Sequence, residues 1–247
     1  MAVTTKSNMI KITKAILLAA GLGTRLRPLT LTTPKPLLKL DGMRLIDVGL
    51  NVLAKAGITD VAINVHYLGD QIRDYVGDGV RYGMRIQYSV ETPKILDTGG
   101  GIRAAAALLG DGPFIALNSD ALCAPDLAAL AERHASSEAS ATMALKRLAT
   151  GDTYQPVATD RDGWIRGLGG EGAHFYIGLQ VLTQEFLNTL PPPGTKSCLI
   201  RDGYLPFIAR GGKVASFIYE GYFNDVGTLE RYEQAKKEVR EGLIRTA

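Results

Sequence analysis

The chain has 247 residues, of which 46% are hydrophobic and 21% charged, with a formal net charge of +3. These values suit a globular protein with one large α/β domain, or one domain with a small appendage. The charge is too small to indicate nucleic-acid binding, and no window approaches the roughly 20 apolar residues of a membrane span. Cys123 and Cys198 lack a metal-binding spacing, and the first residues lack the apolar stretch of a signal peptide. We therefore expect reduced thiols, a cytoplasmic location, and neither nucleic acid nor membrane as a partner.

Strand and helix patterns alternate through the first part of the chain. In chain order the sequence predicts a strand at 14–20, a helix at 45–57, a strand at 60–67, a short helix at 69–79, a strand at 85–91, a helix at 100–110, a strand at 113–120, a helix at 124–135 with Pro125 in its first turn, and a strand at 140–148. Such alternation indicates a Rossmann-like α/β fold, with a mostly parallel central sheet and helices on both faces.

The pattern changes after this point. The sequence predicts a hairpin at 154–170 around the turn D-R-D-G, a strand at 173–182, a helix at 197–212, a strand-like stretch at 213–227 and a final helix at 228–243. The loop PPPGTK at 191–196 is the best candidate for a mobile element. We expect a single domain over 1–247, divided into 14–147, 148–227 and a C-terminal helix over 228–247.

A glycine-rich loop follows the first predicted strand. Residues 17–30 read LLAAGLGTRLRPLT, and TPKPLL follows at 33–38. Glycines after a buried strand let backbone amides approach a phosphate closely, while Arg25, Arg27 and Lys35 can neutralise its charge. The loop lacks the pattern of a P-loop, and Leu26 replaces the third glycine of the dinucleotide fingerprint. The sequence therefore favours a triphosphate site over a plain turn with solvated basic residues.

These residues resemble the signature of the sugar-1-phosphate nucleotidylyltransferases. The motifs INVHYLGDQI, LDTGGGIRAA, FIALNSD and FNDVGT follow in that family's order and extend the resemblance over nearly the whole chain. Within that family, the motif LDTGGGI and the short length of the chain most resemble those of bacterial N-acetylmuramate-1-phosphate uridylyltransferases. Short mannose- or heptose-1-phosphate guanylyltransferases are nearly as similar. The resemblance implies an enzyme that joins UTP or GTP to a sugar 1-phosphate and releases pyrophosphate, in the synthesis of cell-wall or polysaccharide precursors. It also implies that 14–147 binds nucleotide and that 148–227 forms a small β-rich lobe for the sugar.

Two aspartates end predicted strands on the same side of the sheet. Asp120 closes FIALNSD, and Asp225 closes GYFNDVG. Mg²⁺ prefers one or two carboxylates together with phosphate oxygens and water. The alternatives are a helix cap for Asp120 and an ordinary turn residue for Asp225. The resemblance implies that both hold Mg²⁺ as cofactor.

The resemblance also implies roles for the nucleotide half. Arg25 neutralises the leaving phosphates, and Lys35 holds the α-phosphate; both are predicted to be catalytic. Three consecutive glycines in LDTGGGI favour a backbone surface against which the base lies, although a flexible helix entry is the alternative. The predicted nucleotide-binding residues are Ala20, Gly21, Gly23, Thr24, Gly99, Gly100 and Asp120.

The sugar half departs from the family. Many relatives carry a lysine in an E-K-P motif that holds the sugar phosphate, whereas this chain has GLGGEGAHF with Glu171 and no lysine. Tyr176 and Gly178 are predicted to line the sugar pocket, with plain core packing as the alternative for the aromatic ring. Glu171 and Lys196 are also predicted to bind the sugar phosphate, and Lys196 or Arg201 is predicted to replace the missing lysine. His66 lies near the expected site, either touching ligand or simply packed.

Other functions stay open at this stage. A non-catalytic sensor of nucleotide sugars would keep the pocket without the chemistry, and a phosphocholine-type cytidylyltransferase would need an aromatic or acidic cage for its amine. The base, the sugar and the oligomeric state, including a homodimer, are not fixed by the sequence.

Overall fold

The computed structural model describes residues 11–242. The first ten residues, in which the sequence predicts no signal peptide, and the predicted end of the last helix at 243 lie outside this range. Within it, no helix is long and apolar enough to cross a bilayer. Most elements group around one mixed sheet with the path β10–β9–β11–β6–β1–β4–β5, and β8 joins β12 to β11.

The first half of the chain forms the parallel part of this sheet. β1 pairs in parallel with both β4 and β6, and β5 pairs in parallel with β4. The prediction of a mostly parallel sheet is confirmed here. Its strands are β1 (Lys14–Leu18), β4 (Asp60–Val65), β5 (Arg85–Val90) and β6 (Phe114–Asn118).

The second half continues the sheet with mostly antiparallel strands. β11 runs antiparallel to β6, β8 and β9, and the predicted hairpin is the antiparallel pair β9–β10. Two short ribbons, β2–β3 and β7–β13, lie outside the large sheet. The strands are β8 (Ala141–Arg147), β9 (Pro156–Thr159), β10 (Ile165–Leu168), β11 (His174–Leu182), β12 (Val214–Ile218), β2 (Lys39–Leu40), β3 (Met43–Arg44), β7 (Ala121–Leu122) and β13 (Asn224–Asp225).

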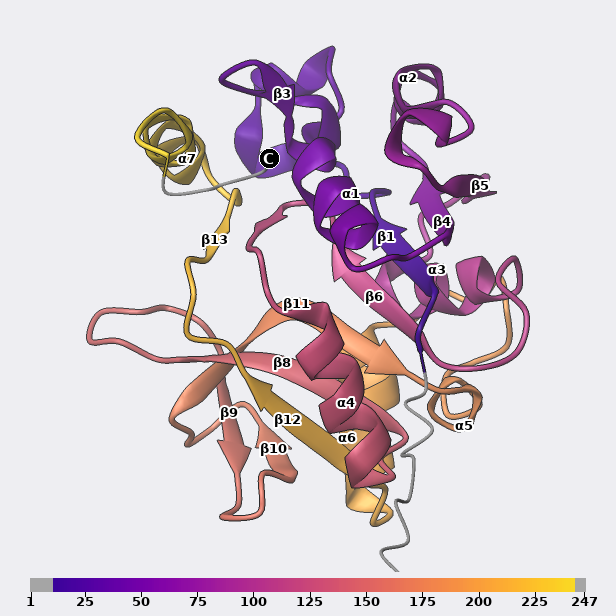
Figure 1. Cartoon of the computed structure of the whole chain (residues 1–247), viewed down its shortest axis with the longest axis vertical. Helices are drawn as coiled ribbons and strands as arrows, with labels where there is room; N and C mark the ends of the chain where they lie inside the picture. Colours follow the sequence, from indigo (N-terminus) through magenta and orange to yellow (C-terminus); the bar gives the residue numbers. More distant parts are fainter. Residues whose placement is uncertain (1–10, 243–247) are drawn as a thin grey trace, which may run out of the picture.

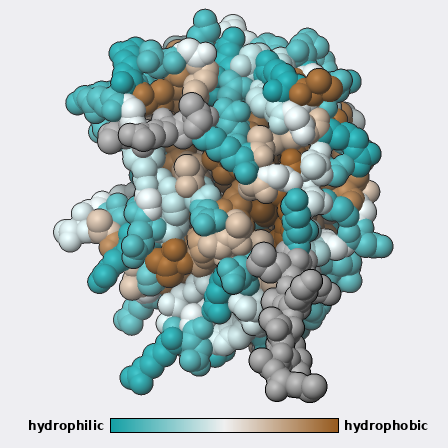
Figure 2. Space-filling model, in the orientation of Figure 1, coloured by the Kyte–Doolittle hydropathy of each residue, from teal (hydrophilic) through white to brown (hydrophobic). Residues whose placement is uncertain are grey.

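Helices cover both faces of the sheet, as the sequence predicts (Figure 1). Alternation along β1 directs Leu17 into one core cluster and Ile16 into the other. The first cluster includes Leu50 of α1 and Leu130 of α4, and the second includes Ile102 of α3. The helices are α1 (Leu45–Lys55), α2 (Gly69–Val76), α3 (Asp97–Ala106), α4 (Leu127–Ser137), α5 (Gln184–Leu187), α6 (Leu205–Ala209) and α7 (Leu229–Arg240). Apolar residues gather towards the centre of the face in Figure 2, and hydrophilic residues surround them.

A third core cluster joins the C-terminal helix to the glycine-rich segment. Tyr232 and Ala235 of α7 pack in this cluster with Leu26, Leu38 and Val226. The Tyr232 hydroxyl also donates a 2.7 Å hydrogen bond to Lys39 O. The last helix is therefore held beside the loop that follows the first strand, although about two hundred residues separate them.

Several predicted boundaries are wrong. α3 begins at Asp97 and not at residue 100. α4 begins at Leu127, because Asp126 caps it by accepting hydrogen bonds from two backbone amides; Pro125 precedes the helix. The helix predicted at 197–212 divides into a π-helical turn at Leu199–Tyr204 and α6. The division of the chain into functional segments stays a prediction.

Candidate active site

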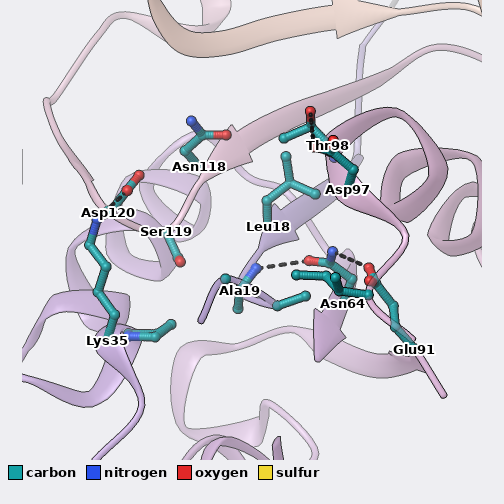
Figure 3. A pocket seen from close by; sticks show the side chains of 14 residues that line it. Leu18, Ala19, Lys35, Asn64, Glu91, Asp97, Thr98, Asn118, Ser119 and Asp120 are labelled. Atoms are coloured by element: carbon teal, nitrogen blue, oxygen red, sulfur yellow. Dashed lines mark hydrogen bonds and ion pairs between the residues drawn. The ribbon is translucent and has the colours of Figure 1, made fainter. Parts of the chain in front are cut away.

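A pocket opens where the parallel strands end, at the carboxyl edge of the sheet. It has a volume of about 210 Å³ and takes residues from the ends of β1, β4, β5 and β6. Ligands of open α/β sheets bind at this edge, where the strand order reverses. The edge pocket is lined by Leu18, Ala19, Ala20, Gly21, Lys35, Pro36, Asn64, Glu91, Ile95, Asp97, Thr98, Asn118, Ser119 and Asp120 (Figure 3).

The two glycines of the loop have different surroundings. Gly23 has a φ of +63°, and a Cβ there would lie 2.9 Å from Thr30 Cγ2 and 3.3 Å from Lys35 Cβ. The Thr30 hydroxyl donates a 2.7 Å hydrogen bond to Gly23 O, which closes the loop on itself. Gly21 lines the edge pocket, and a Cβ there would meet no atom within 4 Å. Protein packing explains Gly23, whereas the open space beside Gly21 leaves room for a ligand.

Lys35 forms an ion pair with Asp120 at one side of the edge pocket (Figure 3). The lysine side chain is only 12% exposed, and that of Asp120 is 31% exposed. A 3-10 turn at Lys35–Leu37, preceded by Pro34, fixes the backbone of the lysine. The sequence therefore predicted correctly that the two residues meet, although the role of each stays a prediction.

The opposite side of the edge pocket contains a buried polar network (Figure 3). Ala19 N donates to Asn64 Oδ1 at 2.8 Å, and Asn64 Nδ2 donates to Glu91 Oε1 at 2.7 Å. The other oxygen of Glu91 accepts a 2.6 Å hydrogen bond from Leu96 N. The sequence analysis missed Asn64 and Glu91. Their signal was that each is a polar residue at or just beyond the end of a predicted strand.

The glycines of α3 pack closely against other segments of the chain. Gly99 N and Gly100 N both donate to Ser197 O, at 2.8 and 3.1 Å. A Cβ on Gly100 would lie 2.4 Å from Thr195 O, and one on Gly101 would lie 2.6 Å from Asn64 Nδ2. These contacts account for the absence of side chains at Gly99 and Gly100, and the nucleotide-binding role of both residues stays a prediction.

Asp225 lies beside Asp120 through the short ribbon of β7 and β13. Asp225 pairs with Ala121, and Val226 N donates a 3.2 Å hydrogen bond to Asp120 O. The Asp225 carboxylate forms an ion pair with Arg231 of α7 and accepts a 3.1 Å hydrogen bond from the Tyr154 hydroxyl. Burial and the carboxylate raise the pKa of Tyr154 to about 12, so this hydroxyl stays protonated and donates.

Arg25 approaches the same segment from the glycine-rich loop. Its guanidinium nitrogens lie 3.5 Å from where a Cβ of Gly227 would be, and its side chain is exposed. Thr24, which begins a 3-10 turn, is also exposed. Arg25, Lys35, Asp120 and Asp225 thus lie on segments that are neighbours in the folded protein. Within residues 11–242, however, no group of three or more His, Cys, Asp or Glu residues is arranged to hold a metal ion.

The predicted sugar residues divide into two groups. Gly178, with a φ of +78°, lies against Asn118 of the edge pocket, where a Cβ would be 2.5 Å from Asn118 Nδ2. Tyr176 instead lines a second cavity of about 280 Å³ in the β-rich lobe, and burial raises the pKa of its hydroxyl. This lobe cavity is lined by Tyr154, Gln155, Pro156, Val157, Leu168, Gly169, Phe175, Tyr176 and Ile200.

The remaining candidates lie outside both cavities. Glu171 and Lys196 are exposed, and neither lines the edge pocket or the lobe cavity. Arg201 forms two 2.9 Å hydrogen bonds with the neighbouring Asp202. His66 Nδ1 lies 2.7 Å from Glu91 O, and whether its ring also touches a ligand stays a prediction. Burial raises the pKa of Cys123 to about 12, which agrees with its not being a nucleophile.

The fold and the site define this chain as a Rossmann-like α/β protein with a polar ligand pocket at the strand ends. Residues 14–242 match the family described as Nucleotidyl transferase, and the chain belongs to this family.

Two curated relatives illustrate the range of the family. The chain is 51% identical over 116 residues to N-acetylmuramate alpha-1-phosphate uridylyltransferase of Neisseria meningitidis, covering 47% of this chain and 50% of that protein. It is 29% identical over 235 residues to mannose-1-phosphate guanylyltransferase of Mycobacterium tuberculosis, covering 93% of this chain and 65% of that protein. The matches thus span from half to about two thirds of these relatives.

Solved structures share the fold. HddC from Yersinia pseudotuberculosis, complexed with GMP-PN, has a TM-score of 0.79 at 23% identity, covering 92% of this chain and 100% of that chain. UDP-glucose pyrophosphorylase in its apo form has a TM-score of 0.75 at 20% identity, covering 94% of this chain and 99% of that chain. At these identities the likeness concerns the fold alone.

Proposed function

We propose that the protein is an enzyme that joins a nucleoside triphosphate to a sugar 1-phosphate, giving an NDP-sugar and pyrophosphate. The observation that carries the proposal is the Lys35–Asp120 ion pair in the edge pocket, beside the open space at Gly21. A carboxylate and a lysine beside a glycine loop suit a ligand that brings both phosphate and a cation.

The reaction is a displacement at the α-phosphorus. The sugar phosphate oxygen attacks this atom while the bond to pyrophosphate breaks, so the pyrophosphate leaves with the bonding electrons. Positioning and charge neutralisation carry such a transfer. Lys35 would hold the α-phosphate, Arg25 would neutralise the departing pyrophosphate, and the loop of Ala20, Gly21 and Gly23 would border the phosphates.

Asp120 and Asp225 are the residues that would hold Mg²⁺. Their side chains are 31% and 30% exposed, and their segments are hydrogen-bonded to one another. Two carboxylates completed by phosphate oxygens and water form a donor set that suits this ion. When bound, Mg²⁺ neutralises charge on the attacking and departing oxygens. We propose that phosphate oxygens of the triphosphate would add to these two carboxylates as ligands of the ion.

We infer UTP and N-acetylmuramate 1-phosphate as the first substrate pair to test. The Neisseria relative, named as an N-acetylmuramate alpha-1-phosphate uridylyltransferase, supports this pair over a 116-residue match. The Mycobacterium relative, named as a mannose-1-phosphate guanylyltransferase, supports GTP and mannose 1-phosphate as the second pair. Two free cysteines suit a reducing, cytoplasmic setting.

A substrate panel tests the proposal. Each of the common nucleoside triphosphates is combined with N-acetylmuramate, mannose and heptose 1-phosphates and with phosphocholine, and pyrophosphate release is measured with and without Mg²⁺. We expect Mg²⁺-dependent release with a uridine or guanosine nucleotide and a sugar 1-phosphate. Nucleotide-sugar binding without release would instead indicate a sensor, and activity with CTP and phosphocholine alone would indicate the cytidylyltransferase. Light scattering on the same sample checks for a homodimer.

A further inference from the structure

Arg231 of α7 is a charged residue of the site that the sequence analysis did not identify. Its guanidinium forms an ion pair with Asp225, and its Cζ lies 4.9 Å from the ring centroid of Tyr154. Its side chain is 34% exposed, so a ligand can reach it. Arg231 thus contacts the candidate metal ligand on one side and an aromatic residue of the β-rich lobe on the other.

Tyr154 connects Arg231 to the lobe cavity. The tyrosine lines this cavity together with Tyr176, the predicted sugar residue. Its ring stacks on Phe175 with centroids 4.1 Å apart and an interplanar angle of 7°. Its hydroxyl donates to Asp225 at 3.1 Å. One side chain therefore spans the distance from the lobe cavity to Asp225, and Arg231 lies at its Asp225 end.

A sugar 1-phosphate must place its phosphate between these two regions. In the proposed reaction, the sugar lies on the lobe side and the attacking oxygen lies at the carboxylate side. A cation that holds the acceptor phosphate is needed at the junction, because the E-K-P lysine of many relatives is missing. Arg231 occupies this junction.

The other candidate cations have unsuitable surroundings. The guanidinium of Arg201 pairs with the neighbouring Asp202, whereas that of Arg231 pairs with Asp225 of the site itself. Lys196 forms no hydrogen bond or ion pair within residues 11–242, and it precedes Ser197, which packs on the glycines of α3. Within the described residues, neither forms a hydrogen bond or ion pair with Asp225, Tyr154 or Tyr176. The structure does not support either as the anchor.

The chemistry of Arg231 suits a phosphate. A guanidinium has five N–H donors in a planar fork, and it binds phosphate oxygens in pairs. The hydrogen bond to Asp225 uses Nη1 and leaves the remaining N–H groups available, while Asp225 and the Tyr154 ring fix the plane of the group. Ordering the side chain in advance lowers the entropy cost of binding a ligand.

Resting on the proposed function, we propose that Arg231 binds the phosphate of the sugar 1-phosphate and replaces the lysine that this chain lacks. It is thereby a substrate-binding residue for the acceptor and has no part in holding the nucleoside triphosphate.

The test compares native protein with Arg231→Gln, Arg231→Lys and the control Arg240→Gln. Arg240 lies at the end of the same helix, is exposed, and pairs with Asp41. The Michaelis constants are measured separately, for N-acetylmuramate 1-phosphate at saturating UTP and for UTP at saturating acceptor, by pyrophosphate release. We expect Arg231→Gln to raise the acceptor KM about 10- to 100-fold, the size of a lost charge-assisted contact. The UTP KM should change less than about twofold, and Arg231→Lys should restore part of the acceptor affinity.

Each outcome decides a separate question. An unchanged acceptor KM, or an equal rise in both Michaelis constants, would overturn the role of Arg231 while leaving the proposed function intact. If Arg231→Gln does not fold, Arg231→Lys tests the role of Arg231 instead, because lysine retains a cation beside Asp225. The proposal then requires that Arg231→Lys raise the acceptor KM and leave the UTP KM unchanged. Native protein that is inactive with every pair in the substrate panel would overturn the proposed function and this role together.

Discussion

The two sides of the candidate site are assembled from the chain in different ways. On the nucleotide side, the glycine-rich loop and Lys35 come from one stretch of chain after β1, and they border the edge pocket together with the ends of β4, β5 and β6. The acceptor side combines Tyr154, Asp225 and Arg231, which come from a loop, a short ribbon and the C-terminal helix. The first side depends on local backbone geometry, whereas the second depends on tertiary packing.

This difference has a physical consequence. Pro34 restricts the backbone just before Lys35, and Gly23 permits the left-handed conformation that the loop requires. Arg231, in contrast, reaches Asp225 only because α7 packs through Tyr232 and Ala235 on the cluster beside the glycine-rich loop. Substitutions on the nucleotide side should therefore affect chemistry directly. Substitutions on the acceptor side should affect the position of groups supplied by distant segments.

The largest effects are expected from removing one charged group on each side of the site, Arg25 on the nucleotide side and Asp225 on the acceptor side. Arg25→Ala should lower turnover by about 10²–10³-fold, the loss typical of a preorganised charge contact, with little change in the acceptor KM. Asp225→Ala should lower turnover similarly, because it removes one of the two carboxylates of the site. Steady-state pyrophosphate release measures both variants.

Arg210→Ala provides the matched control for lost positive charge. Arg210 is exposed and follows α6, away from both cavities as their lining residues define them. It should retain native turnover. Near-native turnover in Arg25→Ala and Asp225→Ala would contradict the roles given to both residues.

The next largest effect is expected at Gly178, whose contact with Asn118 joins the two sides of the site. Alanine there places a Cβ 2.5 Å from Asn118 Nδ2 on a backbone with a φ of +78°. We expect the free energy of unfolding to fall by about 1–3 kcal/mol, from left-handed strain and overpacking, and the acceptor KM to rise. Urea unfolding and steady-state kinetics measure the two effects.

Gly170→Ala separates strain from contact. Gly170 has a φ of +84°, but a Cβ there would meet no atom within 4 Å. Gly170→Ala should lower the free energy of unfolding through backbone strain alone, and it should leave the acceptor KM unchanged. If the two variants behave alike, the contact between Gly178 and Asn118 has no role in joining the two sides.

A smaller effect is expected from the buried network of the edge pocket. Both Glu91 oxygens accept hydrogen bonds, from Asn64 Nδ2 and Leu96 N. Glu91→Gln must point its NH₂ group at one of these donors, so we expect a loss of about 1–2 kcal/mol in unfolding free energy. The nucleotide KM should rise, and the acceptor KM should not.

Exposed Glu132 of α4 provides the control, since Glu132→Gln changes the same charge away from the pocket. Urea unfolding and the two Michaelis constants are compared for both variants. Native stability in Glu91→Gln would show that one accepting oxygen is enough at this position.

Much of the fold was predictable because its causes are local. The apolar runs that form β1, β4 and β6, and the periodic helix α1, need no knowledge of their partners. The meeting of Lys35 with Asp120 followed from the rule that parallel strands end at one edge. Family resemblance added Asp225, whose segment is hydrogen-bonded to that of Asp120.

The rest depended on contacts between distant segments. Tyr154 and Asp225 are separated by 71 residues, and Thr98 and Leu199 by 101. Gly99 and Gly100 suggested a ligand, and the Ser197 segment that packs on them could not be placed from the sequence. A glycine indicates that something comes close, but it does not say whether that is a ligand or protein backbone.

The smallest effect concerns the pH dependence of stability through helix α4, which packs on strand β8 of the β-rich lobe. His134 of α4 is buried against β8, with Nδ1 2.9 Å from Thr142 Oγ1, and burial lowers its pKa below the ordinary value of 6.5. The unfolded chain therefore binds a proton on His134 at a higher pH than the folded protein does. Stability should fall as the pH drops below about 6.5 towards the lowered pKa. Urea unfolding at pH 7.5 and 5.5 should show a smaller difference for His134→Gln than for native protein, because glutamine does not titrate. An equal difference in both proteins would mean that protonation of His134 does not destabilise the protein at low pH and that other groups cause the loss of stability.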